Sequence, residues 1–274
     1  MKKLFLTGTL ALGLLFSLNS ITLAGPQNPA KLPGSANTIS PFTATEIAQK
    51  VYDRNLGDDV TTKASMALIS RNGRTRVREF TTYSKDYGPV IKQLVRFTTP
   101  ADIAGTGFLS IENDDGSTEQ FLYLPALGRT RRIVSSQKNR SFVNTDFTYE
   151  DMQRRRPAAW EHTSNGSETI NNSDCFIITS TAKIETDTAY SQIKSWIVKD
   201  SFMPLRVEFW NKKGKHHKTY QVQTFKNIQN IMTETEIMME NLEKGHQTVI
   251  KSTSVIYNQN LTDKIFSKRH LEEW

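Results

Sequence analysis

Cysteine is nearly absent from this chain of 274 residues, which contains only Cys175. A single cysteine cannot form an internal disulfide, so cross-links within the chain are excluded as a source of stability. The fold must therefore be held together by a hydrophobic core. No cysteine lies near residue 24, and we expect that the chain carries no lipid anchor of its own.

Long apolar runs are missing beyond the first residues. Lys2 and Lys3 precede an apolar stretch over residues 4–16, and a small-residue pattern ends at Ala24. This combination predicts a secretory signal peptide, residues 1–24, cleaved after Ala24. Residues 25–42 are rich in proline and predict a flexible leader. Residues 43–274 then form the working domain of a protein exported to the periplasm.

The sequence also lacks the residue patterns of catalytic and metal sites. Its five histidines have no metal-ligand spacing, and the adjacent His216 and His217 would point to opposite faces of a strand. There is no nucleophile elbow, phosphate-binding loop or zinc-protease helix. The carboxylates of Asp146, Glu150 and Asp151 fit the first turn of a short helix better than acid–base catalysis. We therefore expect no enzyme activity, no metal and no cofactor.

A strong excess of one charge sign is missing as well. The formal net charge is +7, and it becomes +5 (7 − 2) without Lys2 and Lys3. Export and a mild basic excess argue against nucleic acid as a partner and favour anionic lipid headgroups or an acidic protein surface. The same charge is equally well explained as an aid to solubility.

The patterns that are present begin with one amphipathic helix and continue with a period of two. Residues 43–46 (TATE) fit a capping box, and apolar residues recur at helical spacing from Ile47 until Gly57. The alternation after Gly57 predicts twelve strands. They are residues 65–70, 75–83, 91–97, 107–112, 120–124, 130–134, 175–181, 193–198, 205–210, 217–225, 233–241 and 248–256.

Turns of hairpin type separate several of these strands. Residues 72–73, 114–116, 211–214 and 243–245 each end in glycine, which adopts the positive φ that such turns require. Consecutive hairpins predict one antiparallel meander, and so many strands must curl. The fold class is therefore mainly β (α+β): a single curved antiparallel sheet that forms a half-open barrel covered by a few helices. Short helices are expected at residues 148–155 and 263–273.

A resemblance to a known family is carried by a central motif. Residues 124–133 (LPALGRTRRI) and 146–152 (DFTYEDM) resemble the signature of LolA-like proteins, the outer membrane lipoprotein-sorting family. Residues 196–200, 204–208, 238–241 and 266–271 resemble the same family, so the likeness covers nearly all of residues 43–274. It implies a LolA-like fold with an apolar cavity for acyl chains. It also implies a partner of the RND exporter type, or a lipoprotein-release complex, in the inner membrane.

The apolar face of the predicted sheet supplies candidate residues for such a cavity. The lining residues are Met66, Leu68, Val95, Phe97, Phe108, Phe121, Tyr123, Leu205, Val207, Phe209, Ile237 and Met239. A movable cover is predicted from Phe142, Phe147, Tyr149 and Met152. Each of these residues is also explained as ordinary core, but the apolar set is larger than the few predicted helices can cover.

Three arginines of the central motif are candidates for contact with an anion or a partner protein. Arg129, Arg131 and Arg132 carry guanidinium groups, which pair with phosphate or carboxylate. The alternative is that they pair with Glu150, Asp151 or other acids on the surface.

The expected function is carriage of a lipid or lipoprotein acyl chain, for outer membrane lipoprotein sorting or for an RND-type exporter. Burial of a chain of about sixteen carbons at ~0.8 kcal/mol per methylene gives on the order of 10 kcal/mol before ordering costs. Carriage on this scale needs no covalent chemistry. The alternative is a non-catalytic periplasmic interaction or sensor module of an envelope complex, with the same fold and a filled core.

Overall fold

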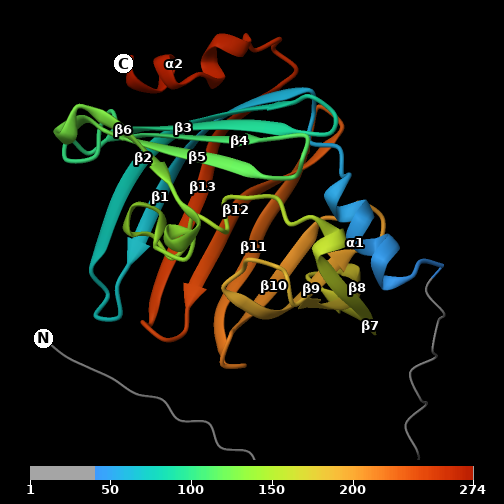
Figure 1. The fold of residues 1–274 in the computed structure, drawn as a ribbon. Coiled ribbons are helices and arrows are strands. Elements are labelled where there is room, and N and C mark those ends of the chain that lie inside the picture. The colour runs from blue at the N-terminus through green and yellow to red at the C-terminus, as the bar shows by residue number, and fades with distance from the viewer. Residues whose placement is uncertain (1–40, 274) are drawn as a thin grey trace, which may run out of the picture. The chain divides into compact units, whose positions relative to one another are not determined.

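Thirteen strands form one antiparallel sheet in the computed structural model of the chain, which describes residues 41–273 (Figure 1). The strands are β1 (Asp59–Ile69), β2 (Thr75–Asp86), β3 (Ile91–Thr99), β4 (Gly107–Glu112), β5 (Thr118–Leu124), β6 (Arg129–Ile133), β7 (Trp160–Ile170), β8 (Ser173–Ala182), β9 (Tyr190–Val198), β10 (Pro204–Asn211), β11 (His216–Ile228), β12 (Ile231–Asn241) and β13 (His246–Tyr257). The α-helices are α1 (Ala44–Tyr52) and α2 (Lys268–Glu272). The predicted signal peptide, and the predicted leader up to residue 40, lie outside the described residues.

The sheet consists of two meanders that meet at its centre. The strand order is β6-β5-β4-β3-β2-β1-β13-β12-β11-β10-β9-β8-β7, so β1 pairs with β13 and the edges are β6 and β7. The two edges do not pair, and the sheet is open. It is strongly curved, as the twist of so many strands requires (Figure 1). The predicted fold class, mainly β with one curved antiparallel sheet, is confirmed.

The connection between the two edge strands runs across the concave face of the sheet (Figure 1). We call residues 134–159 the crossing segment. Its only helical turns are of the 3-10 type: η2 (Ser135–Gln137), η3 (Phe142–Asn144) and η4 (Pro157–Ala159). The predicted helix at residues 148–155 is therefore wrong. The Asp151 carboxylate accepts hydrogen bonds from the backbone nitrogen and hydroxyl of Thr148 at 2.8 and 2.9 Å, and such side-chain bonds favour a turn over a helix.

Strand β7 is the one that the sequence did not reveal. Only Trp160 is buried in it, and most of its other residues are exposed and polar. A strand at the edge of a sheet with a single buried residue has no apolar alternation to detect. The turn to β8 consists of Asn171 and Asn172 at positive φ, a conformation that asparagine tolerates.

The ends of the chain's helices were partly predicted. The capping box of α1 is present, since Thr43 Oγ1 accepts from Glu46 N at 3.2 Å and the Glu46 carboxylate accepts from Thr43 N at 2.7 Å. The helix ends at Tyr52 rather than at Gly57, because Asn55 Oδ1 accepts from Gly57 N and forms a turn there. The predicted helix at residues 263–273 is divided into η5 (Asp263–Phe266) and α2 by Ser267, which caps α2.

Apolar residues cover the sheet on both faces. The concave face carries the largest core cluster, and α1 packs on the same face against Phe176, Ile178 and Ile197. The C-terminal segment, which contains η5 and α2, covers part of the convex face, where Phe266 and Leu271 pack on strands β3–β5 (Figure 1). Cys175 is buried and free.

Candidate functional site

A cavity of about 370 Å³ lies between the concave face of the sheet and the crossing segment. We call it the main cavity. Strands β1, β2, β3, β12 and β13 form its walls, and the crossing segment contributes Phe142, Phe147 and Met152. Its lining on β1 runs from Val60 to Met66 at every second residue, so the cavity follows this strand for roughly 20 Å. This volume lies within the range of small-molecule sites, about 300–1,000 Å³.

A more polar hollow of about 470 Å³ adjoins the main cavity. We call it the polar hollow. The two share lining residues, among them Leu56, Phe147 and Glu234. The polar members of its lining are Ser84, Gln93, Ser110, Glu112, Thr118, Asp151, Gln153, Arg154 and Glu234. An elongated site with one apolar end and one polar end fits an amphiphilic molecule.

Most of the predicted lining and cover residues come together in the core cluster of the concave face. These are Met66, Leu68, Val95, Phe97, Phe108, Val207, Phe209, Ile237, Met239, Phe142, Phe147, Tyr149 and Met152. The cavity itself is lined by only part of this set: Met66, Val95, Ile237, Phe142, Phe147 and Met152. The rings of Phe97, Phe108, Phe142 and Tyr149 pack against one another instead, with the centroids of Phe108 and Phe142 4.9 Å apart.

Three predicted lining residues lie elsewhere. Phe121 and Tyr123 pack on the convex face under the C-terminal segment, because β5 is apolar on both faces and the alternation alone could not assign them. Leu205 lies in an irregularity between the paired residues Pro204 and Arg206, and it packs with Trp196 in a separate cluster. In contrast to the prediction, these three side chains do not line the main cavity.

Ion pairs hold the crossing segment to the sheet near the polar hollow. Asp151 pairs with the fully buried Lys218 and with Arg155 at 3.1 Å, and it accepts from Tyr190 Oη at 2.8 Å. Burial alone would raise the pKa of Asp151, but Lys218 and Arg155 outweigh this effect and the pKa lies below its ordinary value. The Asp151 carboxylate is therefore a structural group that fixes the crossing segment.

The other carboxylates of this region are also engaged within the fold. Glu112 pairs with Arg154 at 3.2 Å and Arg156 at 3.3 Å. Asp146 accepts a hydrogen bond from Thr248 Oγ1 at 2.7 Å, and burial raises the pKa of its carboxyl. Glu150 accepts from Ala189 N at 2.9 Å. The sequence pattern showed Asp146, Glu150 and Asp151 but assigned them to the first turn of a short helix that is absent.

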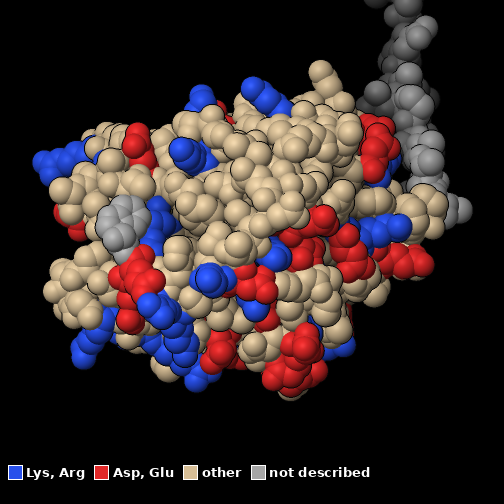
Figure 2. All heavy atoms as spheres, turned by 90° about the horizontal axis from the view of Figure 1, so that it is seen from above, with Lys and Arg blue, Asp and Glu red and all other residues tan. Residues whose placement is uncertain are grey.

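The arginines of the central motif lie on the edge strand β6. Arg129 and Arg131 are exposed, and Arg132 pairs with Glu119 at 2.8 Å. Their predicted alternatives, Glu150 and Asp151, are bound elsewhere, so contact with an anion or partner stays a prediction for Arg129 and Arg131. Figure 2 shows the face that carries the C-terminal segment, on which Lys and Arg side chains are mixed with Asp and Glu around a broad uncharged area.

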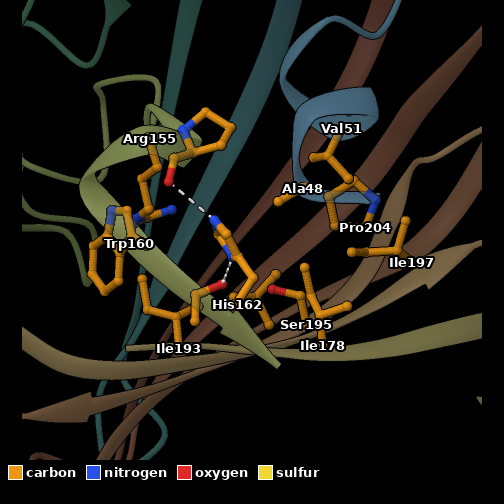
Figure 3. Close-up of a pocket in the computed structure, with 13 residues that line it drawn as sticks. Ala48, Val51, Arg155, Trp160, His162, Ile178, Ile193, Ser195, Ile197 and Pro204 are labelled. Carbon is orange, nitrogen blue, oxygen red and sulfur yellow. Dashed lines mark hydrogen bonds between the residues drawn. The ribbon is translucent and has the colours of Figure 1, made fainter. Parts of the chain in front are cut away.

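A smaller apolar pocket of about 130 Å³ lies under α1 (Figure 3). Ala48 and Val51 of the helix face the sheet across it, and His162 lies at its centre. The imidazole is held by Ser180 Oγ at 2.8 Å and the Pro157 carbonyl at 3.0 Å, and burial lowers its pKa. Both ring nitrogens thus serve the fold, and the pocket is smaller than a typical ligand site.

The described part of the chain offers neither a metal site nor a membrane-spanning helix. Among residues 41–273, no group of His, Cys, Asp and Glu side chains is arranged to hold a metal ion. In the same range, no helix is long and apolar enough to cross a membrane. The main cavity with its polar hollow is therefore the strongest candidate site in the described residues.

Comparisons with known proteins find solved structures with a similar fold. No curated protein matches the sequence. A DUF1329 family protein from Desulfovibrio piger is 29% identical, with a TM-score of 0.79 over 83% of this chain and 97% of its own. A domain from Vibrio parahaemolyticus assigned to outer membrane lipoprotein sorting is 28% identical, with a TM-score of 0.78 over 84% of this chain and 98% of its own.

A more distant structure shows the fold alone. The LolA superfamily protein from Nitrosomonas europaea is 22% identical, with a TM-score of 0.64 over 84% of this chain and 99% of its own. The sequence of residues 91–273 matches the model of a family described as "Uncharacterized protein". The chain belongs to that family, its fold is LolA-like, and its sequence is similar to that of the outer membrane lipoprotein-sorting domain from Vibrio parahaemolyticus.

Proposed function

We propose that this protein is a periplasmic carrier that holds a lipid or lipoprotein acyl chain in the main cavity and catalyses no reaction. The observation that carries the proposal is the main cavity itself. Apolar side chains such as Met66, Val95 and Ile250 border an open space on the concave face, whereas a filled core would hold side chains there. The likeness to a lipoprotein-sorting domain supports the same cargo class and the periplasm as the location.

The proposed partner is an inner-membrane exporter of the RND type or a lipoprotein-release complex. Its support is the family resemblance of the central motif. Arg129 and Arg131 are exposed on an edge strand, where they are available for contact with an acidic protein surface. Transfer of cargo would then begin at the edge of the sheet where the crossing segment also starts.

A pair of alanines on β1 allows a matched test. Ala64 lines the cavity and is buried, whereas Ala67 is three residues further along the strand and faces the opposite side of the sheet. Ala64→Trp places an indole in the acyl site. We expect delipidated wild-type protein and Ala67→Trp to bind a fluorescent fatty acid, and Ala64→Trp to lose at least about tenfold in affinity.

Circular dichroism and melting temperature report whether the variants remain folded. Ser252, which pairs with Ala64 and also lines the cavity, is less buried, so Ser252→Phe is a milder second variant. Binding by both variants at the wild-type level would place the acyl site elsewhere and contradict the proposal.

One observation favours a second candidate function. The aromatic cluster of Phe97, Phe108, Phe142 and Tyr149 fills part of the concave face with side chains. A fully filled core would suit a periplasmic interaction or sensor module. Rejection of every acyl probe by folded, delipidated wild-type protein would favour this function over carriage.

A further inference from the structure

Arg54 lies in the loop after α1, and the hydrogen-bond donors of its guanidinium group are not all paired within the described residues. It lines the main cavity, and its Nη2 lies 3.5 Å from Glu234 Oε1. Charge-assisted hydrogen bonds between such groups are normally about 2.7–2.9 Å long, so this pair is loose. The Nη1 atom of Arg54 is buried and has no hydrogen-bond partner among the described residues. A buried N–H without an acceptor is unfavourable, and a ligand acceptor would relieve it.

Glu234, the partner of Arg54, does not depend on it. The Glu234 carboxylate accepts a hydrogen bond from Tyr220 Oη at 2.6 Å. Glu234 lines both the main cavity and the polar hollow, so its carboxylate lies where the two meet, and Arg54 lies on the side of the main cavity. An incoming anion can therefore bind Arg54 without leaving Glu234 unpartnered.

A second unpaired donor in the adjoining polar hollow favours an anion over a cation. Gln153, which lines the polar hollow, also has a buried amide nitrogen, Nε2, without a hydrogen-bond partner among the described residues. The carboxylates that line the two spaces already have partners within the fold: Glu112 pairs with Arg154 and Arg156, Asp151 pairs with Lys218 and Arg155, and Glu234 accepts from Tyr220.

We propose that the cargo is an acidic amphiphile, whose carboxylate or phosphate head binds Arg54 while its tail lies in the main cavity. Gln153 supplies a second donor in the adjoining hollow. This inference rests on the proposed function and deepens it, because it names the chemistry of the head group. Arg54 thereby becomes the residue that selects acidic lipids over neutral ones.

Two probes with one chain and different heads test this proposal. Oleate and oleyl alcohol are titrated into delipidated protein by calorimetry at neutral pH. Wild type should bind oleate more tightly, and Arg54→Gln should lose about tenfold to a hundredfold in oleate affinity with little change for oleyl alcohol. Glu234→Gln removes the competing carboxylate, so it should bind oleate more tightly than wild type does.

Controls separate the anion site from general damage. Arg74→Gln changes an exposed cation in the turn between β1 and β2 and should leave both affinities unchanged. Retained binding of oleyl alcohol shows that Arg54→Gln is folded. If Arg54→Gln does not fold, the oleate affinity of Glu234→Gln tests the acidic head group instead. Excess inorganic phosphate should not displace oleate; displacement would assign the site to free phosphate.

The failure of this inference differs from the failure of the proposed function. Equal affinities of wild type for the two probes, or an equal loss of both in a folded Arg54→Gln protein, would overturn the acidic head group and leave the carrier intact. Weaker oleate binding by Glu234→Gln would also overturn it. Wild type that binds neither probe would overturn the carrier function itself.

Discussion

Substitution of Lys218 by methionine should destabilise the protein by breaking a buried ion pair. The side chains of Lys218 and Asp151 are only 1% and 3% exposed, and Lys218 also packs on the rings of Tyr190 and Phe209. Methionine keeps most of this apolar packing but leaves the Asp151 carboxylate with one cation fewer. Removal of one partner of a buried pair costs about 3–5 kcal/mol.

The expected loss lies near the lower end of this range. Arg155 remains 3.1 Å from Asp151, and Tyr190 and Thr148 still donate hydrogen bonds to it. We therefore expect Lys218→Met to lower the free energy of unfolding by about 3 kcal/mol near neutral pH. For a domain of this size, that loss lowers the melting temperature by roughly 6–12 °C.

The loss of stability in Lys218→Met should depend on pH. In wild type the pKa of Asp151 is below its ordinary value, so the carboxylate contributes stability above its unfolded pKa and loses it as the pH falls through the folded pKa. In Lys218→Met, burial is opposed by one cation fewer and should raise the pKa of Asp151 above its wild-type value, and protonation at lower pH relieves the incompletely compensated charge. The difference in stability between the two proteins should therefore shrink as the pH is lowered towards about 4 to 5.

Urea unfolding followed by tryptophan fluorescence measures the loss in the free energy of unfolding and its dependence on pH. The double variant Lys218→Met/Asp151→Asn is the control, because it removes the charge that the single variant leaves with Arg155 as its one remaining ion-pair partner among the described residues, and it should recover part of the loss. A loss below about 1 kcal/mol near pH 7, or one that does not change with pH, would refute the role of this ion pair.

Two further predictions concern the segments that cover the sheet. Arg78 is buried and donates from Nη1 to the Val143 carbonyl at 2.6 Å. The variant Arg78→Met should therefore increase amide hydrogen exchange in residues 140–147. Unchanged exchange there would show that this bond does not hold the crossing segment. Arg96 donates to the carbonyls of Leu271 and His270 at 2.9 and 2.6 Å, so Arg96→Met should release the C-terminal segment and cost about 1–3 kcal/mol. Increased binding of the dye ANS would detect the exposed convex face, and wild-type dye binding would contradict this account.

The sheet could be predicted from sequence because its strands alternate and its turns carry glycine. Gly73, Gly116, Gly214 and Gly245 all adopt the positive φ that the hairpin interpretation required. Alternation says less where both faces of a strand are apolar, as the misassigned Phe121 and Tyr123 show. It also fails at an edge strand with little to bury, which is why β7 was missed.

The polar part of the site could not be predicted because its members are distant in the sequence. Arg54 and Glu234 are 180 positions apart, and Asp151 and Lys218 are 67 apart. Arg54 follows the last turn of α1 and belongs to no periodic pattern, so no local signal marked it. The sequence predicted a movable cover from the aromatic residues of the crossing segment, and these residues pack on the concave face, but the turns of the segment depend on contacts that no local pattern shows.

The most direct test of the carrier function is native mass spectrometry of the protein purified from a periplasmic extract without detergent, followed by organic extraction of any bound mass. The carrier function predicts a bound lipid or lipopeptide in wild type and in Ala67→Trp, and little or none in folded Ala64→Trp. A bare mass for wild type, in a protein that also rejects fatty-acid probes after refolding, would contradict the function and favour an interaction module with a filled core.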